Sequence, residues 1–200
     1  MTNRDLSAPP FGVPVTPALP RARLHELVGE AMQLTGLLET PAPPAALRWI
    51  ETFVEAYRDS LSTVADALPH VGELRAESVT IPALHLERLR NRQVLFFLDT
   101  VSQYVDDQPE LRGLPVEHDL LEIAVEFGIA ADDARWAARM ALTARDSGPP
   151  FELLFPLLGH DRIMMRIGAV SSHLLHGRGL EPIAFGPGGK PFRTIEAREQ

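Results

Sequence analysis

The sequence contains no cysteine among its 200 residues. This absence excludes disulfide bonds, thiolate metal sites and a cysteine nucleophile. No apolar run approaches the roughly 20 residues that a membrane-spanning helix needs. Aromatic residues make up only 6% of the chain, and segments typical of β-strands are scarce. The first ten residues have no apolar segment behind their charges, so we expect no signal peptide and a cytoplasmic location.

Charge is unevenly spread along the chain. The net charge is -8, and residues 1–130 hold 10 basic and 19 acidic side chains, a balance of -9. Residues 131–200 hold 9 basic and 8 acidic side chains, a balance of +1. We therefore expect any nucleic-acid surface in the second part or on a local arginine stripe. An acidic protein gains little from non-specific counterion release, so such binding would depend on a few placed contacts.

Apolar residues recur at three- and four-residue spacing, which predicts amphipathic helices. The fold class is therefore predicted as all-α, in two packed helical modules over residues 21–80 and 81–176. Five prolines within residues 1–20 predict an extended or disordered lead-in. Residues 177–200 form a tail rich in glycine and proline, and residues 69–80 are expected to be a loop. The expected helices cover residues 21–38, 45–68, 83–104, 117–127, 132–143, a short apolar stretch ending at Gly159, and 161–175.

The most informative stretch, residues 139–151, reads RMALTARDSGPPF. A helix would carry Arg139 to one end of a bundle, and a proline-containing turn would follow. The backbone of Gly148 and the apolar faces of Pro149 and Phe151 could then line a small pocket. Pockets of this kind hold splayed, single-stranded bases by stacking, by arginine and by backbone hydrogen bonds.

This stretch, continued by Leu157-Leu158-Gly159 and Arg166-Ile167, resembles the C-terminal part of bacterial-type glutamyl-tRNA synthetases. That family has Arg, an apolar residue, Ala-Leu-Thr-Gly, a short polar loop, Ser or Thr before Pro, and an apolar helix closed by Leu-Gly. The resemblance runs without a gap over residues 139–159 and more weakly over 45–175. It implies the anticodon-binding fold of class I synthetases and contacts to anticodon-loop bases. The implied RNA-binding residues are Arg139, Arg145, Ser147, Gly148, Pro149, Phe151 and Arg58.

The sequence departs from the family at several positions. Ala144 stands where the family usually has glycine, and Pro156 interrupts an apolar helix. Gly148 replaces a serine or threonine, so it keeps a backbone N–H but lacks a hydroxyl. Ser60 occupies the place of a basic residue that the family uses on the anticodon, and Arg58 is the nearest substitute.

The catalytic elements of a class I synthetase are missing from the sequence. It has neither a His-Ile-Gly-His-like element nor a Lys-Met-Ser-Lys-Ser-like loop, and no alternating strand–helix pattern. We therefore expect no enzymatic activity, no cofactor and no metal. The resemblance then implies a free-standing, non-catalytic protein that binds a glutamate-type tRNA at its anticodon loop or acts in trans with a separate enzyme. DNA and membranes are not expected as partners.

The same residues are also compatible with a second function. The acidic balance and the departures at Ser60, Ala144 and Gly148 favour a protein-interaction or assembly module that kept the fold and lost RNA binding. It would form a dimer or a heteromeric complex.

Several local features have two interpretations. Arg139 could pair with Asp132 or Asp133 instead of contacting RNA. The arginine stripe at residues 88, 90 and 92 is expected to be a solvated, salt-bridged helix rather than an RNA patch. His173 and His176 lack an evident third metal ligand, and residues 186–190 only superficially match a phosphate loop. Both tryptophans, Trp49 and Trp136, are predicted to be core residues.

Overall fold

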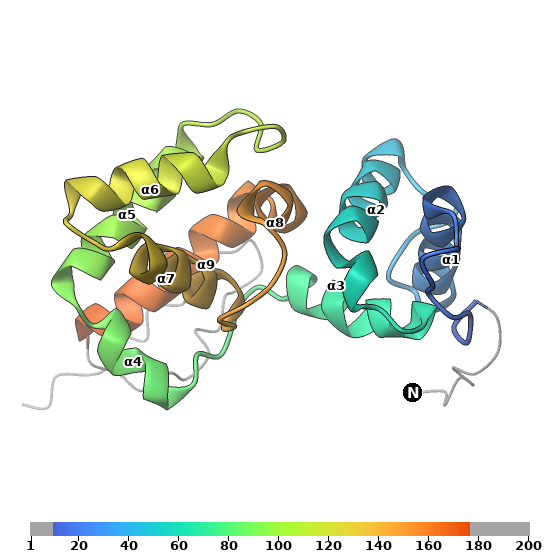
Figure 1. The fold of residues 1–200 in the computed structure, drawn as a ribbon, viewed down its shortest axis with the longest axis horizontal. Helices are drawn as coiled ribbons and strands as arrows, with labels where there is room; N and C mark the ends of the chain where they lie inside the picture. Colours follow the sequence, from blue (N-terminus) through green and yellow to red (C-terminus); the bar gives the residue numbers. More distant parts are fainter. Residues whose placement is uncertain (1–9, 177–200) are drawn as a thin grey trace, which may run out of the picture. The chain divides into compact units, whose positions relative to one another are not determined.

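A computed structural model of the chain describes residues 10–176 (Figure 1). Helices make up the regular structure of this part, which contains no strand beyond an isolated bridge between Pro14 and Thr63. This confirms the predicted all-α class. The predicted tail over 177–200 and residues 1–9 lie outside the described residues. The α-helices are α1 (Arg21–Leu34), α2 (Pro44–Tyr57), α3 (Ala67–Arg75), α4 (Ala83–Leu89), α5 (Arg92–Asp106), α6 (Val116–Glu126), α7 (Ala131–Thr143), α8 (Phe151–Leu158) and α9 (His160–His176).

The expected helix over residues 45–68 ends early, at Tyr57. Two short 3-10 turns follow, η1 (Arg58–Ser60) and η2 (Val64–Asp66), and α3 then occupies the first part of the expected loop. A capping box explains the break: Thr63 and Asp66 each bind the other's backbone N–H, which starts a new helix. Pro69 lies in the first turn of α3, where its missing N–H costs no hydrogen bond. The prediction of one helix followed by a loop was therefore wrong here.

The expected helix over residues 83–104 is also interrupted. The chain leaves helical geometry at Asn91, whose side chain accepts a hydrogen bond from the backbone N–H of Gln93 at 2.9 Å. An asparagine that satisfies an otherwise unpaired N–H starts a helix efficiently. The result is two helices, α4 and α5, in place of one.

The contacts within the chain define two compact units, each of which gathers several stretches of sequence. Unit 1 comprises residues 1–75, 110–117 and 148–159, and unit 2 comprises residues 76–109, 118–147 and 160–200. The sequence prediction had placed 110–117 and 148–159 in the second module. The contacts group them with the first because α8 packs against α2 and α3, and because Arg112 donates a hydrogen bond to the carbonyl of Arg48 in α2.

In unit 1 a column of stacked rings runs along α2. Trp49, Phe53 and Tyr57 stand four residues apart, with ring centroids 5.4 and 5.0 Å from one another, and the ring of His70 in α3 lies tilted against Tyr57. Phe53 is fully buried, and Trp49 is half-buried. The indole N–H of Trp49 donates a hydrogen bond to the carbonyl of Leu157 at 2.8 Å. This bond fixes α8 to α2 although 108 residues separate the two partners.

The described part of the predicted lead-in, residues 10–20, is extended and hydrogen-bonded to unit 1. Its backbone exchanges bonds with the segment around η2, including Val15 N–H to the carbonyl of Ser62 at 2.8 Å. Phe11 is buried, with 4% of its surface exposed. This segment is therefore part of the packed unit.

Unit 2 is built around α9, which packs against α5 and α7. The buried face of α7 consists largely of alanine, and small side chains let helix axes approach closely. Tyr104 of α5 donates a hydrogen bond to the carboxylate of Asp119 in α6 at 2.7 Å. Burial, reinforced by this carboxylate, raises the pKa of Tyr104. The buried alanines of α7 are Ala134, Ala137, Ala138 and Ala141.

None of the helices between residues 10 and 176 is both long enough and apolar enough to cross a membrane.

The capping box predicts a pH dependence of stability. The Asp66 carboxylate accepts hydrogen bonds from the N–H groups of Thr63 (2.8 Å) and Ser62 (2.9 Å), and the Thr63 bond is the main cause that lowers the pKa of Asp66 from 3.8. A carboxyl group whose pKa is lowered by folding stabilises the protein above pH 3.8, and this contribution is lost as the pH falls through the lowered value. We expect Asp66→Asn to lower the free energy of unfolding by about 0.5–1 kcal/mol near neutral pH.

Urea denaturation at a series of pH values measures this effect. The difference between wild type and Asp66→Asn should shrink below the pKa of Asp66. The exposed Asp59 provides the control, since Asp59→Asn should change stability by less than about 0.5 kcal/mol at every pH. A difference for Asp66→Asn that stays constant into the acid range would contradict the capping interpretation.

Candidate RNA-binding site

The seven residues predicted to bind RNA fall in three places. Arg139 lies on α7, Arg58 lies in η1, and the others follow one another between the end of α7 and the start of α8. Arg139, Arg145 and Ser147 belong to unit 2, whereas Gly148, Pro149, Phe151 and Arg58 belong to unit 1.

Arg139 is half-buried one turn before the end of α7. The two aspartates considered as its partners bind other arginines. Asp132 pairs with Arg135 at 3.1 Å, and Asp133 pairs with Arg88. The carbonyl of Arg139 accepts a hydrogen bond from the Thr143 hydroxyl at 2.8 Å, which holds the last turn of the helix in place.

Ala144 ends α7 in the left-handed conformation, with φ 54° and ψ 25°. Its N–H donates to the carbonyl of Met140 at 2.9 Å, as in a helix C-terminus closed by glycine. The family preference for glycine at this position thus has a physical cause, because a Cβ is disfavoured at positive φ. The Thr143 hydroxyl then accepts a hydrogen bond from the N–H of Arg145 at 3.3 Å.

Residues 145–148 form a continuous exposed loop after this turn. Arg145, Ser147 and Gly148 thus present a guanidinium, a hydroxyl and a backbone N–H at the surface. The loop also carries the exposed Asp146, so phosphate contact would depend on the placement of the Arg145 guanidinium, while the backbone and hydroxyl groups can bind base edges.

Two of the residues that follow the loop, Pro149 and Phe151, are buried. None of the Phe151 side chain is exposed. The Phe151 ring lies edge-on to Phe155 at 6.1 Å between centroids. In this arrangement the ring of Phe151 contributes to the core and holds the start of α8.

Arg58 binds the lead-in segment. One guanidinium nitrogen, Nη2, donates to the carbonyls of Thr16, Pro17 and Leu19 at 3.2, 3.0 and 2.7 Å. The side chain is half-buried, and its contacts close residues 16–19 onto η1.

Arg166 of α9 is a residue for which the sequence suggested no role. It is 1% exposed and donates hydrogen bonds to the carbonyls of Leu142, near the end of α7, and of Ala76 at 2.6 Å. The signal in the sequence was its spacing, since Arg166 follows Ile163 by three residues and precedes Val170 by four, on the apolar face of α9. A charged residue on such a face needs buried partners.

A sequence model of the family described as "Anticodon binding domain" matches residues 23–170. The chain belongs to this family. It is 24% identical over 122 residues to glutamate–tRNA ligase 2 of Caldanaerobacter subterraneus subsp. tengcongensis, an alignment that covers 61% of this chain and 25% of that protein. It is 27% identical over 136 residues to the glutamate–tRNA ligase of Akkermansia muciniphila, covering 68% of this chain and 29% of that protein. The aligned part of the chain thus spans about a quarter of the length of these relatives.

Two of the three arginines in the stripe of this anticodon-binding domain form ion pairs, and the third, Arg92, lies over the ring of Phe96. Arg88 pairs with Asp133, and Arg90 pairs with Glu87 at 2.5 Å. The guanidinium of Arg88 also stacks on Trp136 at 3.9 Å, so Trp136 is half-buried under an arginine rather than enclosed in the core. These contacts agree with the salt-bridged interpretation of the stripe.

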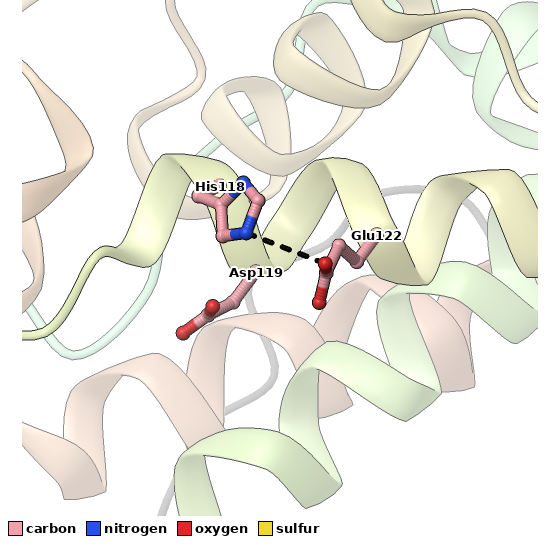
Figure 2. Close-up of side chains that lie close together, drawn as sticks. All are labelled: His118, Asp119 and Glu122. Carbon is pink, nitrogen blue, oxygen red and sulfur yellow. Dashed lines mark ion pairs between the residues drawn. The ribbon is translucent and has the colours of Figure 1, made fainter.

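One group of side chains within residues 10–176 has the composition of a metal site, and it lies on α6 (Figure 2). His118, Asp119 and Glu122 place their ligand atoms within 4.8 Å of one another. His118 forms an ion pair with Glu122 at 3.3 Å, and Asp119 accepts the hydrogen bond of Tyr104. Existing partners therefore account for this cluster. His173, considered for metal binding from the sequence, is buried in α9, and the His176 side chain lies outside the described part.

The left-handed turn of this anticodon-binding domain predicts that Ala144→Gly stabilises it. Glycine removes the steric cost of a Cβ at positive φ but adds freedom to the unfolded chain, so we expect a net gain of about 0.5–1 kcal/mol. Ala138→Gly, in the interior of the same helix, should instead lose about 1 kcal/mol or more. Urea denaturation measures both variants, and a loss of stability in Ala144→Gly would contradict the argument.

The buried position of Arg166 predicts a large loss of stability on truncation. Arg166→Met should reduce the free energy of unfolding by about 2–4 kcal/mol, because the buried carbonyl of Leu142 and the partly buried carbonyl of Ala76 lose a charged donor. Arg135→Met, which removes an exposed ion pair on α7, should cost less than about 1 kcal/mol. Thermal and urea unfolding of the three proteins test this, and equal losses for the two variants would refute the assigned role of Arg166.

Proposed function

We propose that this anticodon-binding domain binds a glutamate-type tRNA at its anticodon loop, using Arg139 and the exposed loop 145–148. The observation that carries the proposal is the arrangement at the end of α7. An arginine on the last turns of a rigid helix is followed, after one left-handed residue, by an exposed loop that offers a guanidinium, a hydroxyl and a backbone donor. The similarity to glutamate–tRNA ligases favours glutamate tRNA.

The two arginines have different parts in this proposal. Arg139 is half-buried on a helix, so its side chain has less conformational freedom than an exposed arginine and is suited to a base contact. Arg145 is exposed in the loop and is suited to a phosphate contact. Gly148 contributes its backbone, while Pro149 and Phe151 are buried at the start of α8. Arg58 keeps residues 16–19 in place.

The domain would supply anticodon recognition without catalysis, in trans with a separate enzyme that acts on the same tRNA. Such a role belongs to the cytoplasm, where translation takes place. Because the net charge of the chain is negative, its affinity for tRNA would come from these few contacts and not from long-range electrostatic attraction.

Binding titrations of the purified chain with glutamate tRNA and an unrelated tRNA, at two salt concentrations, test the proposal. Glutamate tRNA should bind more tightly, and changing its anticodon should remove the difference. Arg139→Ala should weaken binding about tenfold or more and reduce the anticodon preference, since it removes a base contact. Arg145→Ala should weaken binding to both tRNAs alike and lower the slope of log K against log salt by about 1.

Arg135→Ala is the matched control for these variants. It lies on the same helix, pairs with Asp132 and is outside the proposed site, so its tRNA affinity should equal that of wild type. No binding at low salt would overturn the proposal and favour a protein-interaction module. Unchanged selectivity in Arg139→Ala would remove that residue from the base-reading role.

A further inference from the structure

Unit 1 contains a groove between α1 and α2 that neither the family nor the proposed RNA contacts account for. Its volume is about 370 Å³, within the ~300–1,000 Å³ range of ligand sites. Three large apolar side chains and Ala42 contribute to its wall, and Leu47 is exposed over 50% of its surface. The groove is therefore an apolar depression that is open to solvent. The apolar wall includes Leu38, Leu47 and Ile50.

A glycine in the middle of α1 helps to keep the groove open. Gly29 lines it, and a Cβ built on Gly29 would lie 3.5 Å from Cδ1 of Ile50, which is an ordinary contact. Glycine in a helix interior costs about 1 kcal/mol relative to alanine. A methyl group would fit at this position, so packing against Ile50 does not require glycine here. The absence of a side chain leaves space above Ile50.

The rim of the groove is acidic. Glu26 and Glu30 of α1 and Glu51 of α2 border it, and all three are exposed. Glu26 pairs with Arg23 at 2.7 Å. The described residues of unit 1 hold 6 basic and 11 acidic side chains, a balance of -5, and three of these acids gather here. Such a rim repels phosphate and attracts cations.

We propose that this groove binds a basic amphipathic segment of a partner protein. An apolar side chain of the partner would occupy the space above Ile50 beside Leu47, and flanking arginine or lysine residues would pair with Glu30 and Glu51. A short helix laid into an apolar groove with complementary charges at the rim is a recurrent mode of peptide recognition. The same acidic rim excludes the tRNA backbone from this site, so the two binding events use different chemistry.

A designed peptide serves as the probe. It is a short acetylated and amidated helical peptide with leucine on one face and arginine and lysine on the other. In one control peptide serine replaces the leucines, and in a second glutamate replaces the basic residues. NMR titration of the isotope-labelled chain should show shifts centred on the amides of Gly29, Gln33 and Ile50 with the first peptide. Neither control peptide should bind there, and added salt should weaken the first.

Variants of the protein separate the contribution of the apolar groove to peptide binding from that of its acidic rim. Gly29→Met fills the space and should weaken peptide binding about tenfold or more, whereas Gly29→Ala adds only a methyl group in ordinary contact with Ile50 and should weaken binding about twofold or less. Glu30→Gln and Glu51→Gln should each weaken binding about two- to fivefold. Glu110→Gln, an exposed acid of unit 1 outside the groove, should have no effect. Circular dichroism and urea unfolding of Gly29→Met should match those of wild type, which shows that the variant is folded.

Three results would overturn the proposal. The serine peptide could bind as well as the leucine peptide, which would reduce the effect to net charge. Gly29→Met could leave peptide affinity unchanged, which would place the peptide elsewhere. The wild-type chain could self-associate in light scattering and lose this property in Gly29→Met, which would assign the groove to a second copy of the chain.

Discussion

The buried guanidinium of Arg166 is the interaction on which the geometry of unit 2 depends. From α9 it binds the carbonyl of Ala76, where the chain enters the unit, and that of Leu142, near the end of α7. These partners lie 90 and 24 residues away in sequence, so one side chain fixes segments that the chain itself leaves far apart. Leu142 stands two residues before Ala144 and the loop 145–148. Arg166 therefore anchors the end of α7, where the loop with the proposed RNA contacts begins.

The two proposed binding surfaces differ in the charge of the side chains that they present. The domain is acidic, yet the loop after α7 presents Arg145, and the groove of unit 1 presents Glu30 and Glu51. Long-range attraction to RNA is weak in such a protein, so recognition falls to short-range contacts with defined geometry. An acidic groove at another place repels the nucleic acid and remains available for a basic partner. One small domain can then engage an RNA and a protein through chemically distinct sites.

The sequence predicted the helical class and most of α6 to α9, because their apolar spacing is regular and their ends carry Gly128, Pro149 or Gly159. The prediction of helix ends failed where the apolar spacing of one helix continues past its end into the next segment. Leu61 and Val64 keep the spacing of α2, but the capping box of Thr63 and Asp66 starts a new helix there. The burial of Phe151 was not predictable, since it depends on packing with α8's distant neighbours in α2 and α3. Local pattern identifies helix-forming segments, whereas long-range contacts decide which side chains reach solvent.

The interleaving of the two units bears on synthesis of the chain at the ribosome. Unit 1 needs α8, so the residues of α1 to α3 emerge long before the segment that completes their packing. The hydrogen bond from Trp49 to the carbonyl of Leu157 cannot form until α8 has been synthesised. Until then α2 lacks its packing against α8. Neither unit can be obtained by cutting the gene once, because each unit is made of separate stretches of sequence. During translation the first unit is therefore finished only after most of the second has already been made.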